Sequence, residues 1–230
     1  MKTLGVIGGM SPESTVLYYQ IINREVNQRL GGNSSADMLL HSVNFAEIAA
    51  LQERGDWQQA GILLANSAKK LAQMGAEGLV LATNTMHKVA DNIQAAVDIP
   101  LLHVVDATAA AIKQQGLSKV GLLGTRFTMS DGFYTARMNA LGVQTVLPNE
   151  VQQAEIHRVI FEELCRNRFT ESAKRYYQDV MAALQAQGAQ GIILGCTEIG
   201  LLLKQAECSL PLFDSAEIHA LAAVEWLLAD

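Results

Sequence analysis

The sequence alternates short apolar runs with longer amphipathic stretches. The runs are nearly continuous in hydrophobic residues, which is typical of strands buried on both faces of a parallel sheet. They predict strands at residues 2–7, 38–43, 78–82, 101–105, 119–123 and 191–194. The stretches between them predict helices at residues 14–30, 56–75, 85–97, 107–115, 131–141, 152–164, 170–187 and 216–228.

Glycines mark the ends of several predicted helices. Gly75, Gly116, Gly142 and Gly188 each stand where a left-handed residue would close a last helical turn. Strands that alternate with helices are joined by crossover connections, and such connections build a parallel sheet. We therefore predict an α/β protein.

A long internal duplication is visible in the spacing of the apolar runs. Thr83 follows the glycine-ended run at Gly8 at nearly the distance at which Cys196 follows the similar run at Gly124. This period exceeds the roughly 20–50 residues of solenoid repeats, so it indicates two similar α/β units.

Ligands of open parallel sheets bind beyond the carboxyl ends of the strands. We therefore expect two pseudo-symmetric domains, each a parallel sheet flanked by helices. The active site should lie in the interdomain cleft, with Thr83 and Cys196 on opposite walls. Residues 1–103 and 214–230 should form the first domain and residues 104–213 the second.

Composition narrows the class of partner. The 230 residues are 50% hydrophobic, enough to bury a sizeable core, and carry a formal charge of −6 with no cluster of Lys or Arg. Nucleic acid and anionic membranes are therefore not expected as partners. No apolar stretch reaches the roughly 18 residues of a spanning helix, and the N-terminus lacks a signal-peptide core, so we expect a cytoplasmic protein.

Three cysteines and five histidines bear on disulfides and metals. Cys165, Cys196 and Cys208 form neither an even framework nor a C-x-x-C pair, so reduced thiols are expected. The histidines show no ligand spacing, so a bound metal is not expected. His87 stands at a predicted helix start and could reach the cleft.

Several polar segments have both a functional and a structural interpretation. The turn Gly8-Gly9-Met10-Ser11 could offer backbone N–H groups to a carboxylate or phosphate, or could be a tight turn and nothing more. The residues after Thr83 and Cys196 could bind substrate, or could be helix N-caps.

Cys196 also has two interpretations. Free cysteine is often simply a small buried residue. At a strand end before a helix start, however, the helix dipole would lower its pKa and favour the thiolate, which could act as base or nucleophile. Cys165 and Cys208 are interpreted as structural.

Four segments of the chain form a recognisable set: Gly8-Gly9-Met10-Ser11, Thr83-Asn84-Thr85-Met86-His87, Gly124-Thr125-Arg126-Phe127-Thr128 and Gly195-Cys196-Thr197-Glu198. Through these segments the whole chain resembles the aspartate/glutamate racemase family of cofactor-independent amino-acid racemases. The sequence looks most like the broad-specificity or aspartate/glutamate racemases of enteric bacteria. The resemblance implies two pseudo-symmetric α/β domains, a homodimer, and two catalytic residues on opposite sides of the substrate Cα.

The chain departs from the usual pattern of the family at two places. Most members carry Cys-Asn-Thr where this chain has Thr83, whose hydroxyl can donate or relay a proton but cannot be held ionised as a thiol can. Several aspartate racemases place a lysine on the helix that here contains Cys165, where it binds the distal carboxylate. Gln52, Arg54 and Arg126 are candidate replacements.

The resemblance therefore implies a cofactor-independent racemase of aspartate, glutamate or a broader set of amino acids, including homoserine-like ones. Thr83 and Cys196 would be catalytic, and the second cysteine would act on the L enantiomer. The substrate-binding residues would be Met10, Ser11, Gln52, Asn84, Thr85, Thr125 and Thr197. Two alternatives remain open: a related thiol-dependent decarboxylase or isomerase, and an amino-acid-binding protein that has lost catalysis.

Overall fold

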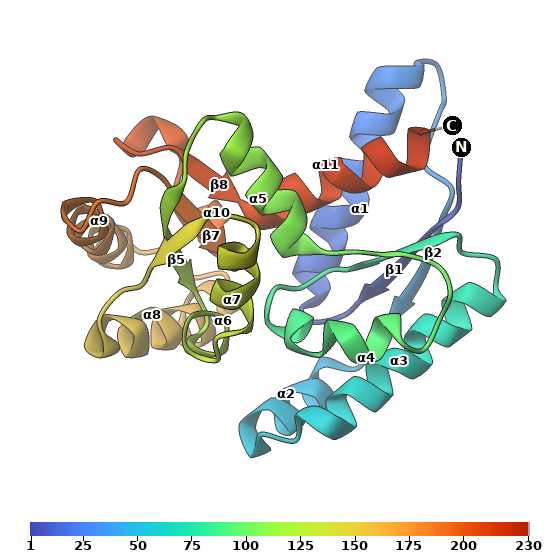
Figure 1. Cartoon of the computed structure of the whole chain (residues 1–230), viewed down its shortest axis with the longest axis horizontal. Helices are drawn as coiled ribbons and strands as arrows, with labels where there is room; N and C mark the ends of the chain where they lie inside the picture. Colours follow the sequence, from blue (N-terminus) through green and yellow to red (C-terminus); the bar gives the residue numbers. More distant parts are fainter. Residues whose placement is uncertain (230) are drawn as a thin grey trace. The chain divides into compact units, whose positions relative to one another are not determined.

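Two parallel four-stranded sheets with equivalent strand orders organise the chain (Figure 1). The computed structural model describes residues 1–229. The first sheet has the order β2-β1-β3-β4 and the second β6-β5-β7-β8, with parallel pairing throughout. Helices flank both sheets, so the predicted fold class is confirmed: an α/β protein with two parallel sheets.

The elements of the first half follow one another in the order expected for crossover connections. They are β1 (Leu4–Gly8), α1 (Pro12–Leu30), β2 (Met38–Ser42), α2 (Phe45–Arg54), α3 (Trp57–Gln73), β3 (Gly78–Leu81), the 3-10 helix η1 (Thr85–Val89), α4 (Ala90–Gln94) and β4 (Leu101–Leu102). In Figure 1, α1 lies on one side of this sheet and α2, α3 and α4 lie on the other.

The second half repeats the scheme. Its elements are α5 (Val104–Gln114), β5 (Lys119–Gly124), α6 (Arg126–Ser130), α7 (Phe133–Ala140), β6 (Gln144–Val146), α8 (Glu150–Glu162), η2 (Leu164–Arg166), α9 (Glu171–Ala186), β7 (Ile192–Gly195), α10 (Ile199–Leu202), η3 (Gln205–Glu207), β8 (Leu212–Asp214) and α11 (Ser215–Leu228).

The strand register makes the duplication explicit. In the first sheet Ile7 pairs with Leu81, and the Ala82 N–H then donates to the Ile7 carbonyl oxygen at 2.9 Å. In the second sheet Gly124 pairs with Gly195. Thr83 lies two residues after Leu81 of the Ile7–Leu81 pair, and Cys196 lies two residues after Leu194 of the Leu123–Leu194 pair. The two residues therefore occupy equivalent positions at the carboxyl ends of the two sheets.

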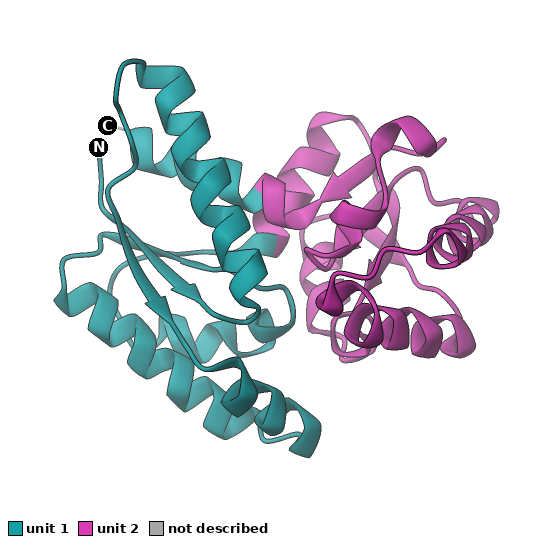
Figure 2. Ribbon diagram, turned by 180° about the vertical axis from the view of Figure 1, so that it is seen from behind, with its two compact units in different colours: residues 1–104, 219–230 teal, residues 105–218 magenta. Residues whose placement is uncertain are grey.

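The chain divides into two compact units (Figure 2). Unit 1 comprises Met1–Val104 and the segment that begins at His219, and unit 2 comprises Val105–Ile218. The sequence analysis placed these boundaries at 103/104 and 213/214, and its bound at residue 230 lies outside the described residues. Both boundaries fall within helices: α5 begins in unit 1, and α11 begins in unit 2.

Glycine permits close packing at the start of β3 in unit 1. A Cβ on Gly78 would lie 2.5 Å from an indole carbon of Trp226 on α11, so only glycine leaves room for that ring. On the other side of the sheet, residues of α2, α3 and β3 form one buried cluster with Ile7. The second tryptophan, Trp57, lies under the Lys88 ammonium, 3.9 Å from its ring centroid. These contacts form the core beneath the Thr83 strand end.

Several predicted elements need correction. The strand predicted at 101–105 is only Leu101–Leu102, because α5 already begins at Val104. The helix predicted at 85–97 is a 3-10 turn followed by α4. The one predicted at 131–141 is α7, and the short helix α6 before it was not predicted. Strands β6 and β8 and helices α2 and α10 were not predicted. The four glycines expected at helix ends all have positive φ, as predicted. Within residues 1–229, no helix combines the length and apolar character that crossing a bilayer requires.

Candidate functional site

Thr83 lies in a turn whose backbone is held by His87. The Thr83 carbonyl oxygen accepts a hydrogen bond from His87 Nδ1 at 2.7 Å, and His87 Nε2 accepts one from the Val104 N–H at 3.2 Å. These two bonds assign the neutral Nδ1–H tautomer to the ring. His87, which the sequence analysis considered able to reach the cleft, is 3% exposed, and both of its nitrogens bond the protein backbone. Its role is to fix the turn.

A glutamine from α2 lies against the same turn. Gln52 is buried, and its Nε2 atom contacts Met86 Sδ at 3.0 Å. The structure thus brings Gln52 close to the segment that follows Thr83, where Asn84 and Thr85 are also buried. Arg54, near the end of α2, is exposed. Asn84 occupies the N-cap position of η1, but its side chain makes no capping hydrogen bond. The N-cap interpretation therefore fails for Asn84.

The glycine turn of unit 1 is a tight turn with internal bonding. The Gly9 N–H donates to Thr15 Oγ1 at 2.7 Å, so it is not open to an anion. Gly9 has φ 89°, and a Cβ there would lie 2.3 Å from the Val43 carbonyl oxygen. Ser11 caps α1 by accepting from the Ser14 N–H, and Met10 joins the buried core cluster. The structural interpretation accounts for the positions of these residues, and a role in substrate binding stays a prediction.

The carboxyl edge of the second sheet presents Thr125 beside Cys196. Each follows one member of the Gly124–Gly195 pair. Thr125 is the N-cap of α6, where its side chain accepts from the Thr128 N–H. Arg126 next to it is exposed, and its backbone N–H donates to Nδ1 of His157.

Cys196 is partly exposed, and its thiol donates to a carboxylate. The Cys196 Sγ atom lies 3.0 Å from Oε2 of Glu198, and Thr197 Oγ1 donates to the same oxygen at 2.6 Å. The pKa of the Cys196 thiol is raised well above its usual value, first by desolvation and then by the charge of Glu198.

The expectation that a helix dipole lowers the pKa of Cys196 is therefore wrong. The helix that follows, α10, has only four residues and begins after Glu198 rather than directly after the cysteine. Its dipole is small, while burial and a neighbouring negative charge both disfavour the thiolate. The thiol is protonated in the resting protein.

Two further groups of unit 2 act on Cys196. Cys165 raises the pKa of the Cys196 thiol, and Cys196 contributes to a raised pKa of the Tyr177 phenol on α9. Tyr177 and the carboxylate of Glu198 were not among the predicted site residues. The spacing Cys-x-Glu was the signal for Glu198, whereas Tyr177 comes from a distant helix and left no local signal. Cys165 lies in η2, not in the helix predicted at 152–164.

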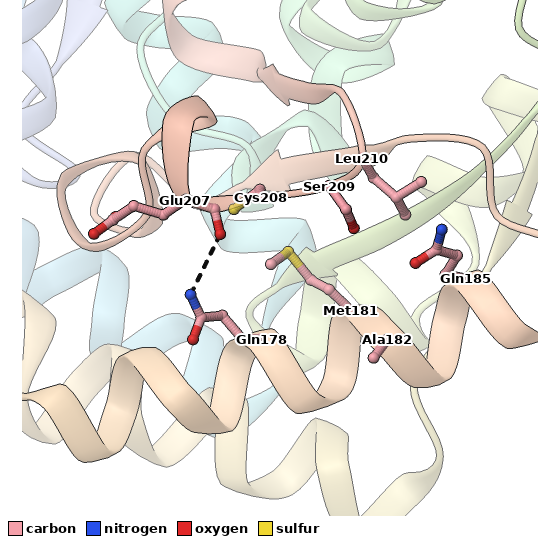
Figure 3. A pocket seen from close by; sticks show the side chains of 8 residues that line it. All are labelled: Gln178, Met181, Ala182, Gln185, Glu207, Cys208, Ser209 and Leu210. Atoms are coloured by element: carbon pink, nitrogen blue, oxygen red, sulfur yellow. Dashed lines mark hydrogen bonds between the residues drawn. The ribbon is translucent and has the colours of Figure 1, made fainter.

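Unit 2 contains cavities that are lined by residues other than the predicted site residues. One of about 220 Å³ lies between α9 and the segment 207–210 (Figure 3). Its lining includes Met181 and Cys208, and Gln178 Nε2 donates to the Glu207 carbonyl oxygen at its edge. Among the described residues, no three His, Cys, Asp or Glu side chains are grouped to hold a metal ion.

Comparisons with known proteins agree with the resemblance. The Asp/Glu/hydantoin racemase family model matches residues 7–223. The chain is similar over its full length to the crystal structure of a candidate Asp/Glu racemase from Yersinia pestis, with 51% identity and a TM-score of 0.95. It is also similar to an aspartate racemase homologue from Pyrococcus horikoshii OT3, with 36% identity, a TM-score of 0.86 and full coverage of both chains.

One curated relative adds a catalytic description. The broad specificity amino-acid racemase RacX of Bacillus subtilis (strain 168) is 24% identical over 229 residues, which is 98% of each chain. The family model spans nearly the whole sequence, and the structural matches cover both units. The chain therefore belongs to the Asp/Glu/hydantoin racemase family.

Proposed function

We propose that the protein is a cofactor-independent amino-acid racemase in which Cys196 and Thr83 act on opposite faces of the substrate Cα. One observation carries the proposal: the two residues follow equivalent pairs at the carboxyl ends of two sheets with equivalent strand order. A racemase must break and make a C–H bond on two faces of one carbon, which two equivalent positions suit. Asn84, Thr85 and Thr197 would bind the α-carboxylate and ammonium.

Cys196 would remove the α-proton of the L enantiomer, and Thr83 would deliver a proton to the other face. The threonine hydroxyl would serve as a relay, because it is too weak an acid to remain ionised. Met10, Ser11, Gln52 and Thr125 would complete the substrate site.

The proposed substrates are aspartate, glutamate and neutral polar amino acids such as homoserine. Cys165 and Tyr177 carry no positive charge beside Cys196, so a distal carboxylate would gain no ion pair from them. A site without a charged partner discriminates weakly between neutral and acidic side chains. We expect a survey of free amino acids to show turnover of both kinds. Strict dependence on aspartate, with neutral polar amino acids inert, would contradict this substrate range.

One experiment tests the reaction itself. The protein is incubated with L- and D-amino acids in D₂O, and NMR follows loss of the Cα proton while a chiral assay follows inversion. We expect exchange and inversion without added pyridoxal phosphate or metal. Binding without exchange would indicate an amino-acid-binding protein, and conversion to another compound would indicate a lyase or a different isomerase.

A further inference from the structure

We propose that Glu198 is a positioning residue that holds the Cys196 proton at rest and receives it when the sulfur becomes a base. The inference rests on the proposed function, because it supplies the proton acceptor that the proposed base requires. It goes beyond that function by assigning a task to a side chain with no other assigned role.

The first support is the geometry around one carboxylate oxygen. Oε2 of Glu198 lies 3.0 Å from Cys196 Sγ and 2.6 Å from Thr197 Oγ1. The hydrogen bond runs from the Cys196 thiol to this oxygen, so the thiol proton points at Oε2. Glu198 is 7% exposed, so water competes little for this oxygen. The thiol and its proton acceptor are already in contact.

The second support is that Glu198 is not used as a helix cap. It precedes α10 with helical φ −72° and ψ −25°, and its side chain makes no cap hydrogen bond. The N-cap interpretation of the sequence therefore fails at this residue. The side chain turns back onto the strand end instead, although capping would be the usual reason for a polar residue at this place.

The third support is the electrostatic setting of the thiol. The groups that act on Cys196 are Glu198 beside it, Cys165 from η2 and Tyr177 from α9. Their side chains are acidic or neutral, and each disfavours the thiolate when it is ionised, whereas a backbone hydrogen bond from Glu198 lowers the Cys196 pKa by a smaller amount. A sulfur in this setting becomes a base only if a nearby group takes its proton. Glu198 is the group in contact.

The proton movements balance. The Cys196 S–H bond breaks and an O–H bond forms on Glu198, leaving a thiolate and a neutral acid. The thiolate takes the Cα proton, whose bonding electrons remain on carbon as a carbanion. Thr83 gives its proton to the other face while it accepts one from water. The proton that Glu198 releases to solvent neutralises the resulting hydroxide, and the resting state is restored.

The first measurement needs no racemase activity. Iodoacetamide alkylates thiolates, so the alkylation rate of the Cys196 peptide, followed by mass spectrometry across pH, reports the thiol pKa. In Glu198→Gln the negative charge is lost, and we expect the midpoint to fall by roughly one pH unit. The control is Glu162→Gln, an exposed carboxylate bonded to Arg158 in the same unit, which should leave the midpoint unchanged. An unchanged midpoint in Glu198→Gln overturns the pairing.

The second measurement is Cα proton exchange in D₂O. Glu198→Gln should lower kcat at neutral pH by about 10- to 100-fold with little change in KM, because the proton acceptor is lost. Its remaining rate should rise with pH as solvent ionises the thiol. A variant with a lower alkylation midpoint and undiminished exchange would show that Glu198 only perturbs charge, which overturns its role as proton acceptor.

Two further outcomes keep the proposals separate. If the parent exchanges no Cα proton with any amino acid, the proposed function and the acceptor step fail together, while the alkylation midpoint still decides whether Glu198 pairs with the thiol. If Glu198→Gln does not fold, Glu198→Asp replaces it, with the carboxylate one methylene shorter. Asp should keep the midpoint near that of the parent and still slow exchange. Exchange at the parental rate in Glu198→Asp counts against the acceptor role.

Discussion

At the two equivalent strand ends of this protein, a neighbouring side chain bonds different parts of the candidate residue: the backbone at one end and the side chain at the other. At the end of β3, His87 binds the backbone carbonyl of Thr83. At the end of β7, Glu198 binds the side chain of Cys196. A hydroxyl that relays a proton needs its position fixed more than its ionisation, whereas a thiol that serves as a base needs a partner for its proton. In the proposed mechanism, an imidazole meets the first need and a carboxylate meets the second.

The next strands along the two sheets differ in a related way. Leu102 pairs with Val80, and Phe213 pairs with Ile193, so His103 and Asp214 are the equivalent next residues. The His103 ring packs on His87 with centroids 4.5 Å apart. Asp214 instead accepts from the N–H groups of Ala216 and Glu217 at the start of α11. Unit 1 thus packs two rings edge-on behind its strand end, whereas unit 2 places a second carboxylate there.

The largest effect is expected from Cys196→Ser. A serine hydroxyl is a far weaker acid than a thiol, so proton abstraction and Cα exchange should fall by about 10³-fold or more. Exchange in D₂O measures the loss, and circular dichroism should show an unchanged fold. Cys208→Ser is the matched control and should keep its activity. Near-normal turnover in Cys196→Ser would remove this sulfur from the chemistry.

The substitution His87→Leu tests the role of the imidazole at the strand end of unit 1. Leucine leaves the Thr83 carbonyl and the Val104 N–H without their buried partner, so unfolding in urea should show a loss of about 2–4 kcal/mol. Inversion should slow, because the turn is no longer fixed. The alkylation midpoint of Cys196 should not move. Lys88→Gln in the same turn is the control and should cost less than about 1 kcal/mol.

Asp214→Asn tests the carboxylate of unit 2 through its pH dependence. Burial raises the pKa of Asp214 from 3.8 to about 6. Its stabilising contribution is therefore complete below pH 3.8 and is lost as pH rises through about 6, so the ionised form destabilises the fold at pH 7. Asparagine keeps the accepting oxygen for the start of α11. We expect the variant to be about 1–3 kcal/mol more stable than the parent at pH 7.

This stability gap should close in acid. Urea unfolding at several pH values measures it, and the two proteins should converge below about pH 4. Asp214→Ala is the control, because it removes the capping oxygen along with the charge and should lose the benefit of the cap at every pH. A gap between Asp214→Asn and the parent that does not change with pH would contradict the raised pKa.

The smallest effect is expected from Thr83→Cys, which makes the two strand ends alike. Enantiomers in achiral solvent have equal free energy, so kcat/KM must be the same in both directions whatever the catalytic residues. The order of partial reactions can still differ. If Thr83 reprotonates slowly, L Cα exchange should outpace D formation in the parent, and Thr83→Cys should narrow that ratio several-fold. Equal rates in the parent, unchanged in the variant, would show that Thr83 does not limit the second proton transfer.

The sequence predicted the strands that lie in apolar runs, and it missed two short ones, β6 and β8. β6 has the sequence Gln-Thr-Val, and β8, which follows Pro211, also has three residues. Neither contains an apolar run long enough to indicate a strand. Helix α2 was missed although its caps are legible: Asn44 accepts from the Ala46 N–H, and Gly55 closes the helix in a left-handed conformation. The duplication could be recognised because it depends on the spacing between apolar runs, which does not change when residue types are substituted.

The places of Thr83 and Cys196 at strand ends were predicted correctly, whereas the protonation of Cys196 was not. Thr83 and Cys196 could be found from the chain because strand ends are encoded locally. The pKa of Cys196 could not, because it depends on how the Glu198 side chain turns and on Cys165 and Tyr177 from other elements. His87 was noticed for its place after Thr83, but its two backbone partners depend on where α5 begins.

The packing of Trp226 on Gly78 places a fluorescent side chain in the core of unit 1. Trp57 and Trp226 are the only tryptophans of the chain, and both belong to unit 1. Indole fluorescence therefore reports the melting of unit 1, while circular dichroism averages over the helices of both units. Transitions that coincide by the two methods would mean that the units unfold as one cooperative body, and separated transitions would resolve the stability of each.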